Sequence, residues 1–313
     1  MLVLDAEAVR ARAPMPAMIA CLREAFRRRP TAHPRQIVDL SGGAGERLLL
    51  VMPAFDSNTA AVKLATVTPG NAAKGLPTVQ AAIVAFSETG TPIALLDGAS
   101  VTQLRTAAAS ALASQYLSRE DSAHLVVIGT GALAPYMAAG HCTVRPISRV
   151  SVWGRRQERT VATVNAIRSL VASHIEVTAA QSVEEAVASA DIVTCATTSK
   201  TPVLLGRWLK RGVFVDLVGS FTRAAREADD DAVLRSRIFV DTFEGALAEA
   251  GDLLDPLERG ILRRERIEGE LADLVCGRVA GRVDQDESIL FKSVGTAIED
   301  FAAVQLIVGQ PAA

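Results

Sequence analysis

The sequence predicts an α/β protein in two parts: an N-terminal α+β domain and a doubly wound parallel sheet. Three observations predict this class. Short β-like runs, separated by Gly, Pro, Asn and Asp clusters, fill residues 34–97. From residue 123 onward, strongly apolar strand patterns alternate with helical ones. After the first of these strands comes the glycine-rich stretch GTGALA at 129–134.

Bulk composition limits the class of protein. The chain has 313 residues, 49% hydrophobic and 22% charged, which is typical of a folded protein with one or two cores. Its net charge of −2 argues against nucleic acid as a partner. We expect no signal peptide and no membrane span, because no basic leader and no long apolar run is present. The four scattered cysteines predict reduced thiols, a cytoplasmic location and no metal site.

The first part begins with helices and continues with strands. A short helix is predicted over 5–12, and Pro16 opens a longer one that ends near Arg29. The runs between 34 and 97 predict a mostly antiparallel sheet. Residues 100–117, rich in alanine and leucine, predict one buried helix.

The second part alternates strands and helices. Its predicted strands are HLVVIG, RVSVW, IEVTA, DIVTCAT, GVFVDLVG and RIFVD, with helical material between them. The last segment, TAIEDFAAVQLIVG, predicts a helix whose apolar face packs back on the first domain. We therefore expect one domain from 1–120 with 294–313, and a second domain from 121–293.

The glycine-rich stretch has the spacing of a phosphate-binding turn. Gly129 allows a tight turn, Gly131 lets backbone amides approach a pyrophosphate, and Ala134 is small enough for close helix packing. Pro135 suits the first helical turn, and the helix N-terminus attracts phosphate. The stretch predicts a dinucleotide site in a Rossmann domain. The alternative is an ordinary tight turn between a strand and a helix.

The end of the second strand indicates which dinucleotide is bound. An acidic residue there would bond a ribose hydroxyl, whereas an arginine can pair with a 2′-phosphate. The stretch SVWGRRQ has Gly154, which would leave room for a phosphate, followed by Arg155 and Arg156. NADP is therefore favoured, and NAD remains possible. The alternative is that the two arginines simply begin an exposed helix.

Several segments together resemble the ornithine cyclodeaminase/mu-crystallin family over nearly the whole chain. The matching segments are VMPAF at 51–55, VKLATVTPGNAAKGLPTVQA at 62–81, LLDGASVTQLRTAAASALAS at 95–114, VVIGTGA at 126–132, SVWGR at 151–155 and SILFKSVGTAIEDFAA at 288–303. The resemblance implies an N-terminal domain for substrate binding and dimerisation, a Rossmann domain, and a C-terminal helix that returns to the first domain. It also implies a homodimer formed through the N-terminal sheets.

Three basic residues stand where the family binds the α-carboxylate of its substrate. They are Arg35, Lys63 and Arg105. Read by itself, Lys63 is a lysine inside an apolar strand, which is costly to bury unless it is paired. The guanidinium fork of arginine suits a carboxylate. The alternatives are an edge charge for Arg35, a snorkelling stem for Lys63 and a structural ion pair for Arg105.

Further residues are candidates for nucleotide binding. Thr197 and Thr198 follow the strand DIVTCAT, and Ser293 and Gly295 lie in FKSVG, which resembles a family stretch near the nicotinamide. The alternative for each is a turn or cap residue. The complete predicted set is Gly129, Thr130, Gly131, Ala132, Gly154, Arg155, Arg156, Thr197, Thr198, Val218, Ser293 and Gly295.

The chain departs from the family's ornithine cyclodeaminases at three positions. Gly154 stands in place of an acid, Phe221 in place of a catalytic aspartate, and Leu50 in place of a glutamate that holds ornithine. What remains is a carboxylate-binding set and a nicotinamide. This favours an NAD(P)H-dependent reductase of a small cyclic imine such as pyrroline-2-carboxylate, or of a 2-imino acid. In that reaction Lys63, or a water beside it, would deliver the proton. An ornithine cyclodeaminase and a non-catalytic NADP-binding protein remain the alternatives.

Overall fold

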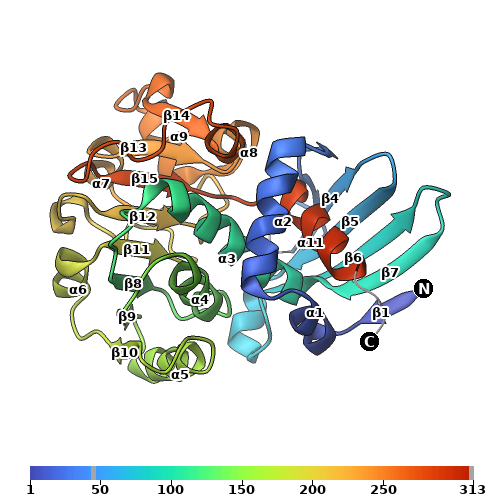
Figure 1. Cartoon of the computed structure of the whole chain (residues 1–313), viewed down its shortest axis with the longest axis horizontal. Coiled ribbons are helices and arrows are strands. Elements are labelled where there is room, and N and C mark those ends of the chain that lie inside the picture. Colours follow the sequence, from blue (N-terminus) through green and yellow to red (C-terminus); the bar gives the residue numbers. More distant parts are fainter. Residues whose placement is uncertain (44–46, 310–313) are drawn as a thin grey trace. The chain divides into compact units, whose positions relative to one another are not determined.

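The computed structural model describes residues 1–43 and 47–309 of the chain (Figure 1). Its contacts divide the chain into two compact units, Met1–Arg105 with Thr296–Ala313, and Thr106–Gly295. The division falls inside helix α3 (Gly98–Leu117), whereas the boundary expected from the sequence follows the end of that helix. The first unit is therefore discontinuous in sequence, and the second is one continuous segment.

The first unit contains a seven-stranded sheet with the order β1-β7-β6-β5-β4-β2, in which β3 also pairs with β4. All pairs are antiparallel except β1 with β7. The strands are β1 (Leu2–Leu4), β2 (Thr31–Ala32), β3 (Gln36–Asp39), β4 (Leu48–Phe55), β5 (Thr59–Val67), β6 (Val79–Ser87) and β7 (Pro92–Asp97). The predicted antiparallel sheet is present, and the short strands β1 and β2 were not predicted.

Three helices complete the first unit: α1 (Ala6–Arg12), α2 (Met15–Arg28) and the C-terminal helix α11 (Ala297–Val308). The side chain of Asp5 caps α1 by accepting from two backbone N–H groups. Helix α11 packs against α2, β4 and β5, so the last helix of the chain lies beside one of the first (Figure 1). A 3₁₀ helix, η1 (Pro69–Lys74), joins β5 to β6.

The second unit contains an eight-stranded, wholly parallel sheet with the order β10-β9-β8-β11-β12-β15-β13-β14. Its strands are β8 (His124–Ile128), β9 (Arg149–Trp153), β10 (Glu176–Ala179), β11 (Ile192–Cys195), β12 (Phe214–Leu217), β13 (Arg237–Val240), β14 (Ile267–Glu270) and β15 (Ile289–Lys292). The chain winds from β8 to one edge and then, from β11, toward the other. The order therefore reverses between β8 and β11, where doubly wound sheets bind ligands.

Helices and short 3₁₀ turns connect these strands. They are α4 (Ala134–Val144), α5 (Gln157–Arg168), α6 (Val183–Ser189), η2 (Gly206–Trp208), α7 (Asp230–Leu234), α8 (Phe243–Glu249), α9 (Gly251–Glu258), η3 (Arg264–Arg266) and α10 (Leu271–Val275). Every residue of β8, β11, β12 and β15 is buried, as expected for a parallel sheet covered on both faces. Within the described part of the chain, no helix is long and apolar enough to cross a membrane.

Candidate functional site

The glycine-rich turn between β8 and α4 contains two glycines, and the surroundings of the two differ. Gly129 has a φ of +130°, and a Cβ there would lie 2.4 Å from the carbonyl oxygen of Ala196. A side chain at this position is thus excluded by the backbone of the loop after β11. At Gly131, by contrast, a Cβ would meet no atom within 4 Å. The protein itself does not require this glycine, which fits a position that must admit a ligand.

The start of helix α4 is suited to an anion. Its N-cap residue, Leu133, makes no side-chain capping hydrogen bond, and Pro135 occupies the first turn. The N–H groups of a helix's first turn lack helical partners and carry the positive end of its dipole. Together with the open space at Gly131, this helix start fits the pyrophosphate of a dinucleotide.

The end of β9 carries the residues predicted to choose between NAD and NADP. We expected Gly154 to leave room for a phosphate, and this reason is wrong. A Cβ on Gly154 would lie 2.4 Å from Cγ2 of Thr130, so the threonine fills the space. The glycine instead allows this loop to pack closely on the glycine-rich turn.

Arg155 and Arg156 follow directly and are both exposed. Within residues 1–43 and 47–309, neither guanidinium makes a hydrogen bond or an ion pair. Arg156 is the N-cap residue of α5, and its side chain does not cap the helix. Two uncompensated cations at a helix start would attract a phosphate.

The candidates after β11 and β12 belong to one hydrogen-bonded loop pair. Thr197 donates its backbone N–H and its hydroxyl to Oε1 of Glu227, over 2.7 and 2.9 Å. Val218 is buried, and its N–H donates to the carbonyl of Cys195 over 3.0 Å. Thr198 is exposed. The sequence did not identify Glu227, whose carboxylate holds this region together.

The loop after β15 is shaped by another buried carboxylate. Oδ2 of Asp241 accepts hydrogen bonds from the hydroxyl of Ser293 (3.1 Å) and from the N–H groups of Val294 (2.8 Å) and Gly295 (2.6 Å). Gly295 has a φ of +82°, which favours glycine. These contacts give Ser293 and Gly295 a structural role, whether or not a nucleotide also touches the loop.

The first unit holds a buried group of charged side chains around Lys63 of β5. Its Nζ lies 2.8 Å from Oδ1 and 2.7 Å from Oδ2 of Asp300, and only 3% of the lysine is exposed. Arg105 donates from Nε to Oδ1 of Asp300 over 3.1 Å and from a terminal nitrogen to Glu299 over 2.5 Å. Both acids come from α11. The cost of burying Lys63 predicted a partner, but the sequence did not identify it.

The pKa of Lys63 is affected by the charges of the other two predicted carboxylate-binding residues. Burial lowers the pKa of Lys63 to about 8, and the neighbouring Asp300 opposes this shift. The charges of Arg105 and Arg35 lower the same pKa further. Arg35 is half-buried just before β3. The three cations therefore act on one another, and two acids of α11 compensate part of their charge.

The positions that set this chain apart from cyclodeaminases are apolar in the structure. Leu50 is buried in β4, opposite Ala65 of β5. Phe221 packs against the core of the second unit. Neither position can supply a carboxylate. Among the described residues, no group of three or more His, Cys, Asp or Glu side chains could hold a metal.

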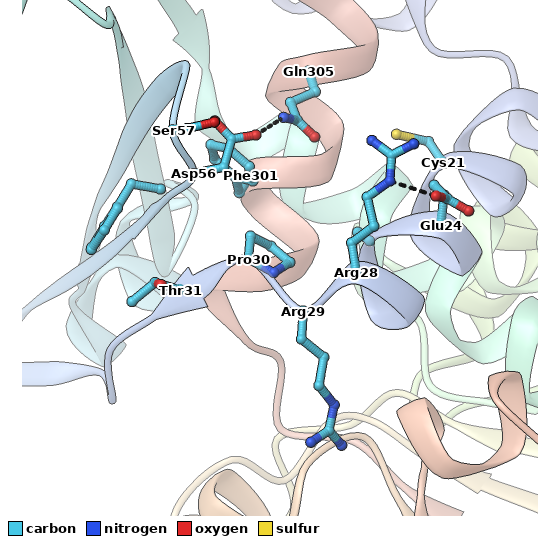
Figure 2. A pocket seen from close by; sticks show the side chains of 12 residues that line it. Cys21, Glu24, Arg28, Arg29, Pro30, Thr31, Asp56, Ser57, Phe301 and Gln305 are labelled. Atoms are coloured by element: carbon cyan, nitrogen blue, oxygen red, sulfur yellow. Dashed lines mark hydrogen bonds and ion pairs between the residues drawn. The ribbon is translucent and has the colours of Figure 1, made fainter. Parts of the chain in front are cut away.

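A hollow of about 660 Å³ lies elsewhere in the first unit, between the end of α2, the turn after β4 and α11 (Figure 2). Arg28 binds Glu24 at one side of it, and Gln305 donates to Asp56 over 2.8 Å at the other (Figure 2). None of the predicted site residues lines this hollow. It is distinct from the group around Lys63.

Comparison with known proteins agrees with the fold and with the motifs. A model of the ornithine cyclodeaminase/mu-crystallin family matches residues 1–311. A Delta(1)-pyrroline-2-carboxylate reductase from Colwellia psychrerythraea is 39% identical over 312 residues, which are 98% of each chain. A reductase of the same name from Paracoccus denitrificans is 38% identical over 247 residues, covering 78% of this chain and 77% of the other.

Two solved structures are similar over nearly the whole chain. Delta(1)-pyrroline-2-carboxylate reductase from Thermococcus litoralis, in complex with NADH and L-proline, has a TM-score of 0.94 and 34% identity, covering 99% of this chain and 97% of its own. An archaeal alanine dehydrogenase dimer with bound NAD has a TM-score of 0.90 and 27% identity, covering 99% and 95%. The predicted family and the predicted α/β fold with a Rossmann domain are confirmed.

Proposed function

Because the chain belongs to the ornithine cyclodeaminase/mu-crystallin family, we propose that it reduces a small cyclic imine bearing a carboxylate, such as pyrroline-2-carboxylate, to the amino acid. The observation that carries this proposal is the buried cation group around Lys63, combined with apolar residues where a cyclodeaminase needs acids. The names of the relatives from Colwellia and Thermococcus agree with the predicted reductase.

The chain's own residues have the following roles in this proposal. Arg35, Lys63 and Arg105 bind the substrate carboxylate and so fix the orientation of the imine. Asp300 keeps Lys63 in place and favours its charged form, because its carboxylate lies against Nζ. Lys63 then holds a proton at Nζ that the imine nitrogen can take. When bound, the nicotinamide supplies the hydride that reduces the imine carbon.

The residues at the proposed site favour pyrroline-2-carboxylate over ornithine as the substrate. A cyclic imine needs no leaving group and can arrive already protonated. Ornithine deamination would need carboxylates at positions where this chain has Phe221 and Leu50. The reduction therefore needs fewer acidic or basic side chains from the enzyme than ornithine deamination does.

The direct test is the oxidation of NADPH, with NADH in parallel, in the presence of pyrroline-2-carboxylate, piperideine-2-carboxylate, or pyruvate with ammonia. The proposal expects stoichiometric consumption of the reduced cofactor with at least one of the cyclic imines. Release of ammonia from ornithine with only catalytic NAD would identify a cyclodeaminase instead. Absence of turnover with the whole panel, together with tight NADPH binding, would indicate a non-catalytic binding protein.

We further propose that the cofactor is NADP rather than NAD, with Arg155 and Arg156 binding the 2′-phosphate. The exposure of both arginines and their lack of partners in the described chain support this proposal. The two similar solved structures, by contrast, are described with NADH and with NAD. A double substitution of both arginines by serine is expected to lower the ratio of kcat/KM for NADPH to that for NADH by about 10–100-fold. A charge-assisted hydrogen bond contributes about 1.5–3 kcal/mol, which corresponds to this range.

The matched control for this prediction is Arg264→Ser, which removes an exposed arginine of η3 in the same unit. It should leave the ratio unchanged. If the double variant keeps the wild-type ratio, the two arginines do not read the 2′-phosphate.

A homodimer formed through the first unit's sheet is also proposed. Val38 and Leu64 are 46% and 40% exposed, and together with Val51 they lie on one face of the sheet by strand pairing. Such an apolar face on a folded chain is typical of a protein interface. The archaeal alanine dehydrogenase is described as a dimer, which supports a dimer here as well.

Light scattering is expected to give twice the chain mass of 33.0 kDa for the wild type. Leu64→Arg should shift the mass toward that of a single chain, because a buried unpaired charge disfavours association. Val283→Arg changes an apolar residue of the second unit that is 72% exposed and should remain dimeric. A dimeric Leu64→Arg variant would rule out this face as the interface.

A further inference from the structure

Glu227 is a fully buried acid that the proposed reaction does not use. Each of its oxygens accepts two hydrogen bonds. Oε1 accepts from the N–H of Thr197 (2.7 Å) and from its hydroxyl (2.9 Å). Oε2 accepts from the N–H groups of Gly219 (2.7 Å) and Ser220 (3.1 Å). A single carboxylate therefore joins the loop after β11 to the loop after β12.

The backbones of these two loops pack so closely that there is no room for a side chain at Gly219. A Cβ on Gly219 would lie 2.1 Å from the carbonyl oxygen and 2.2 Å from the nitrogen of Thr197. Both loops stand at the carboxyl ends of central strands, next to the point where the strand order reverses. Ligands of doubly wound sheets bind at such strand ends.

A buried ion pair, Asp252 with Lys292, holds the backbone at Glu227 in place. Asp252 accepts from the N–H groups of Glu227 (2.7 Å) and Ala228 (3.0 Å). Its other oxygen lies 3.1 Å from Nζ of Lys292, and both side chains are fully buried. Burying three charged groups is expensive in free energy. Core stability alone would be served better by apolar residues at these positions.

We propose that Glu227 is a positioning residue for the nicotinamide half of the dinucleotide. It fixes the loops after β11 and β12 in one arrangement, so that Thr197 and the backbone near Val218 meet the nicotinamide in a preset geometry. The inference rests on the proposed function, because it requires that the second unit binds a nicotinamide dinucleotide. The adenosine half, bound by the glycine-rich turn and the end of β9, does not depend on Glu227.

The test compares two ligands that differ only by the nicotinamide half. Glu227→Gln replaces one acceptor oxygen by an NH₂ group that faces N–H donors, so one loop is released. Titration calorimetry is expected to show the Kd of NADPH raised by about 10–100-fold, the effect of about 1–3 kcal/mol for unsatisfied buried donors. The Kd of adenosine 2′,5′-bisphosphate should change less than about twofold.

Thr197→Val is the second variant, in case Glu227→Gln folds poorly. It removes one of the four hydrogen bonds and keeps the side-chain shape, so the Kd of NADPH should rise by about 3–10-fold, again without effect on the bisphosphate. Glu184→Gln, the same change at an exposed glutamate of α6, is the matched control. It should bind both ligands as the wild type does.

A pH titration gives an independent reading. Burial raises the pKa of Glu227 to about 7, the charge of Lys292 opposes this, Asp252 adds to it, and the hydrogen bonds of Thr197 lower it. The neighbouring thiol of Cys195 also has a raised pKa, mainly because it is buried and also because the charge of Glu227 disfavours the thiolate. Only the ionised carboxylate accepts all four donors, so the affinity for NADH should fall below about pH 7. NADH is chosen because it lacks a titrating 2′-phosphate, and Glu227→Gln should abolish this dependence.

The possible outcomes separate the two ideas. Equal weakening of NADPH and of the bisphosphate in Glu227→Gln would overturn the positioning role, since it indicates general damage. Unchanged NADPH binding in both variants would overturn it as well, while leaving the proposed function intact. If the wild type bound neither ligand, the proposed function would fail, and the role of Glu227 with it.

Discussion

Replacing Lys63 by methionine is expected to lower kcat/KM for a cyclic imine carboxylate by about a thousandfold. In the proposed reaction, the change removes a buried cation that contacts the substrate carboxylate and carries the transferable proton. Hydrogen bonds to charged groups contribute about 1.5–3 kcal/mol, and proton transfer by a positioned group about 10²–10⁴ in rate. Steady-state kinetics with pyrroline-2-carboxylate measure the effect. A variant with wild-type kcat/KM would exclude Lys63 from both carboxylate binding and proton delivery.

Two further measurements test whether the lower kcat/KM comes from the loss of the lysine or from a misfolded variant. The variant should keep its fold, because Asp300 retains its hydrogen bond from Arg105 at 3.1 Å, so its Kd for NADPH should equal that of the wild type. In the wild type, the charged lysine is the form that binds a carboxylate, and its pKa of about 8 implies that this binding is lost as the pH rises through that value. Pyrrole-2-carboxylate, a planar carboxylate probe, should therefore bind more weakly above about pH 8 to the wild type, and Lys63→Met should lack that step.

Replacing Gly131 by valine is expected to weaken NADPH binding by about a hundredfold or more without lowering the melting temperature. A Cβ at this position meets no protein atom within 4 Å, so a β-carbon can be added without a clash with the folded chain. In the predicted dinucleotide site the pyrophosphate approaches the backbone through this space, so the valine would exclude it. Titration calorimetry and thermal unfolding together measure both halves of the prediction.

Gly129→Ala is the informative comparison. Here φ is +130° and the added methyl carbon would lie 2.4 Å from the oxygen of Ala196, so the free energy of unfolding should fall by about 1–3 kcal/mol. We therefore expect the two glycines of one motif to separate into a structural and a binding position. If Gly131→Val bound NADPH normally, the turn would not be the pyrophosphate site.

Patterns that are local in sequence were sufficient to predict most of the elements. The alternation of apolar runs and turn residues predicted the antiparallel sheet and the first six strands of the parallel sheet, β8 to β13. The last two strands, β14 and β15, were not predicted, although β15 lies between β12 and β13 in the sheet. Each of these strands has only four residues, which is too short for a clear periodic pattern, and its sequence does not indicate its place in the sheet.

The partners of the site residues could not be predicted in the same way. Asp300 is 237 positions from Lys63, and no periodicity links two such residues. Helical patterning places acids on solvated faces, yet Glu299 and Asp300 are both buried. The cost of burying Lys63 was the one available signal, and it indicated that a partner exists without saying which. Likewise, the close approach of Thr130 to Gly154 is known only from the fold.

The discontinuous first unit has a consequence for the order in which this protein is made. The second unit, Thr106–Gly295, is one uninterrupted segment and can become compact as soon as it leaves the ribosome. The sheet of the first unit emerges earlier, but it must wait for α11, the last helix, to complete its core. Until then Lys63 and Arg105 lack the two acids that neutralise them. The charged cluster that would bind substrate is therefore assembled only after the whole second unit has been synthesised.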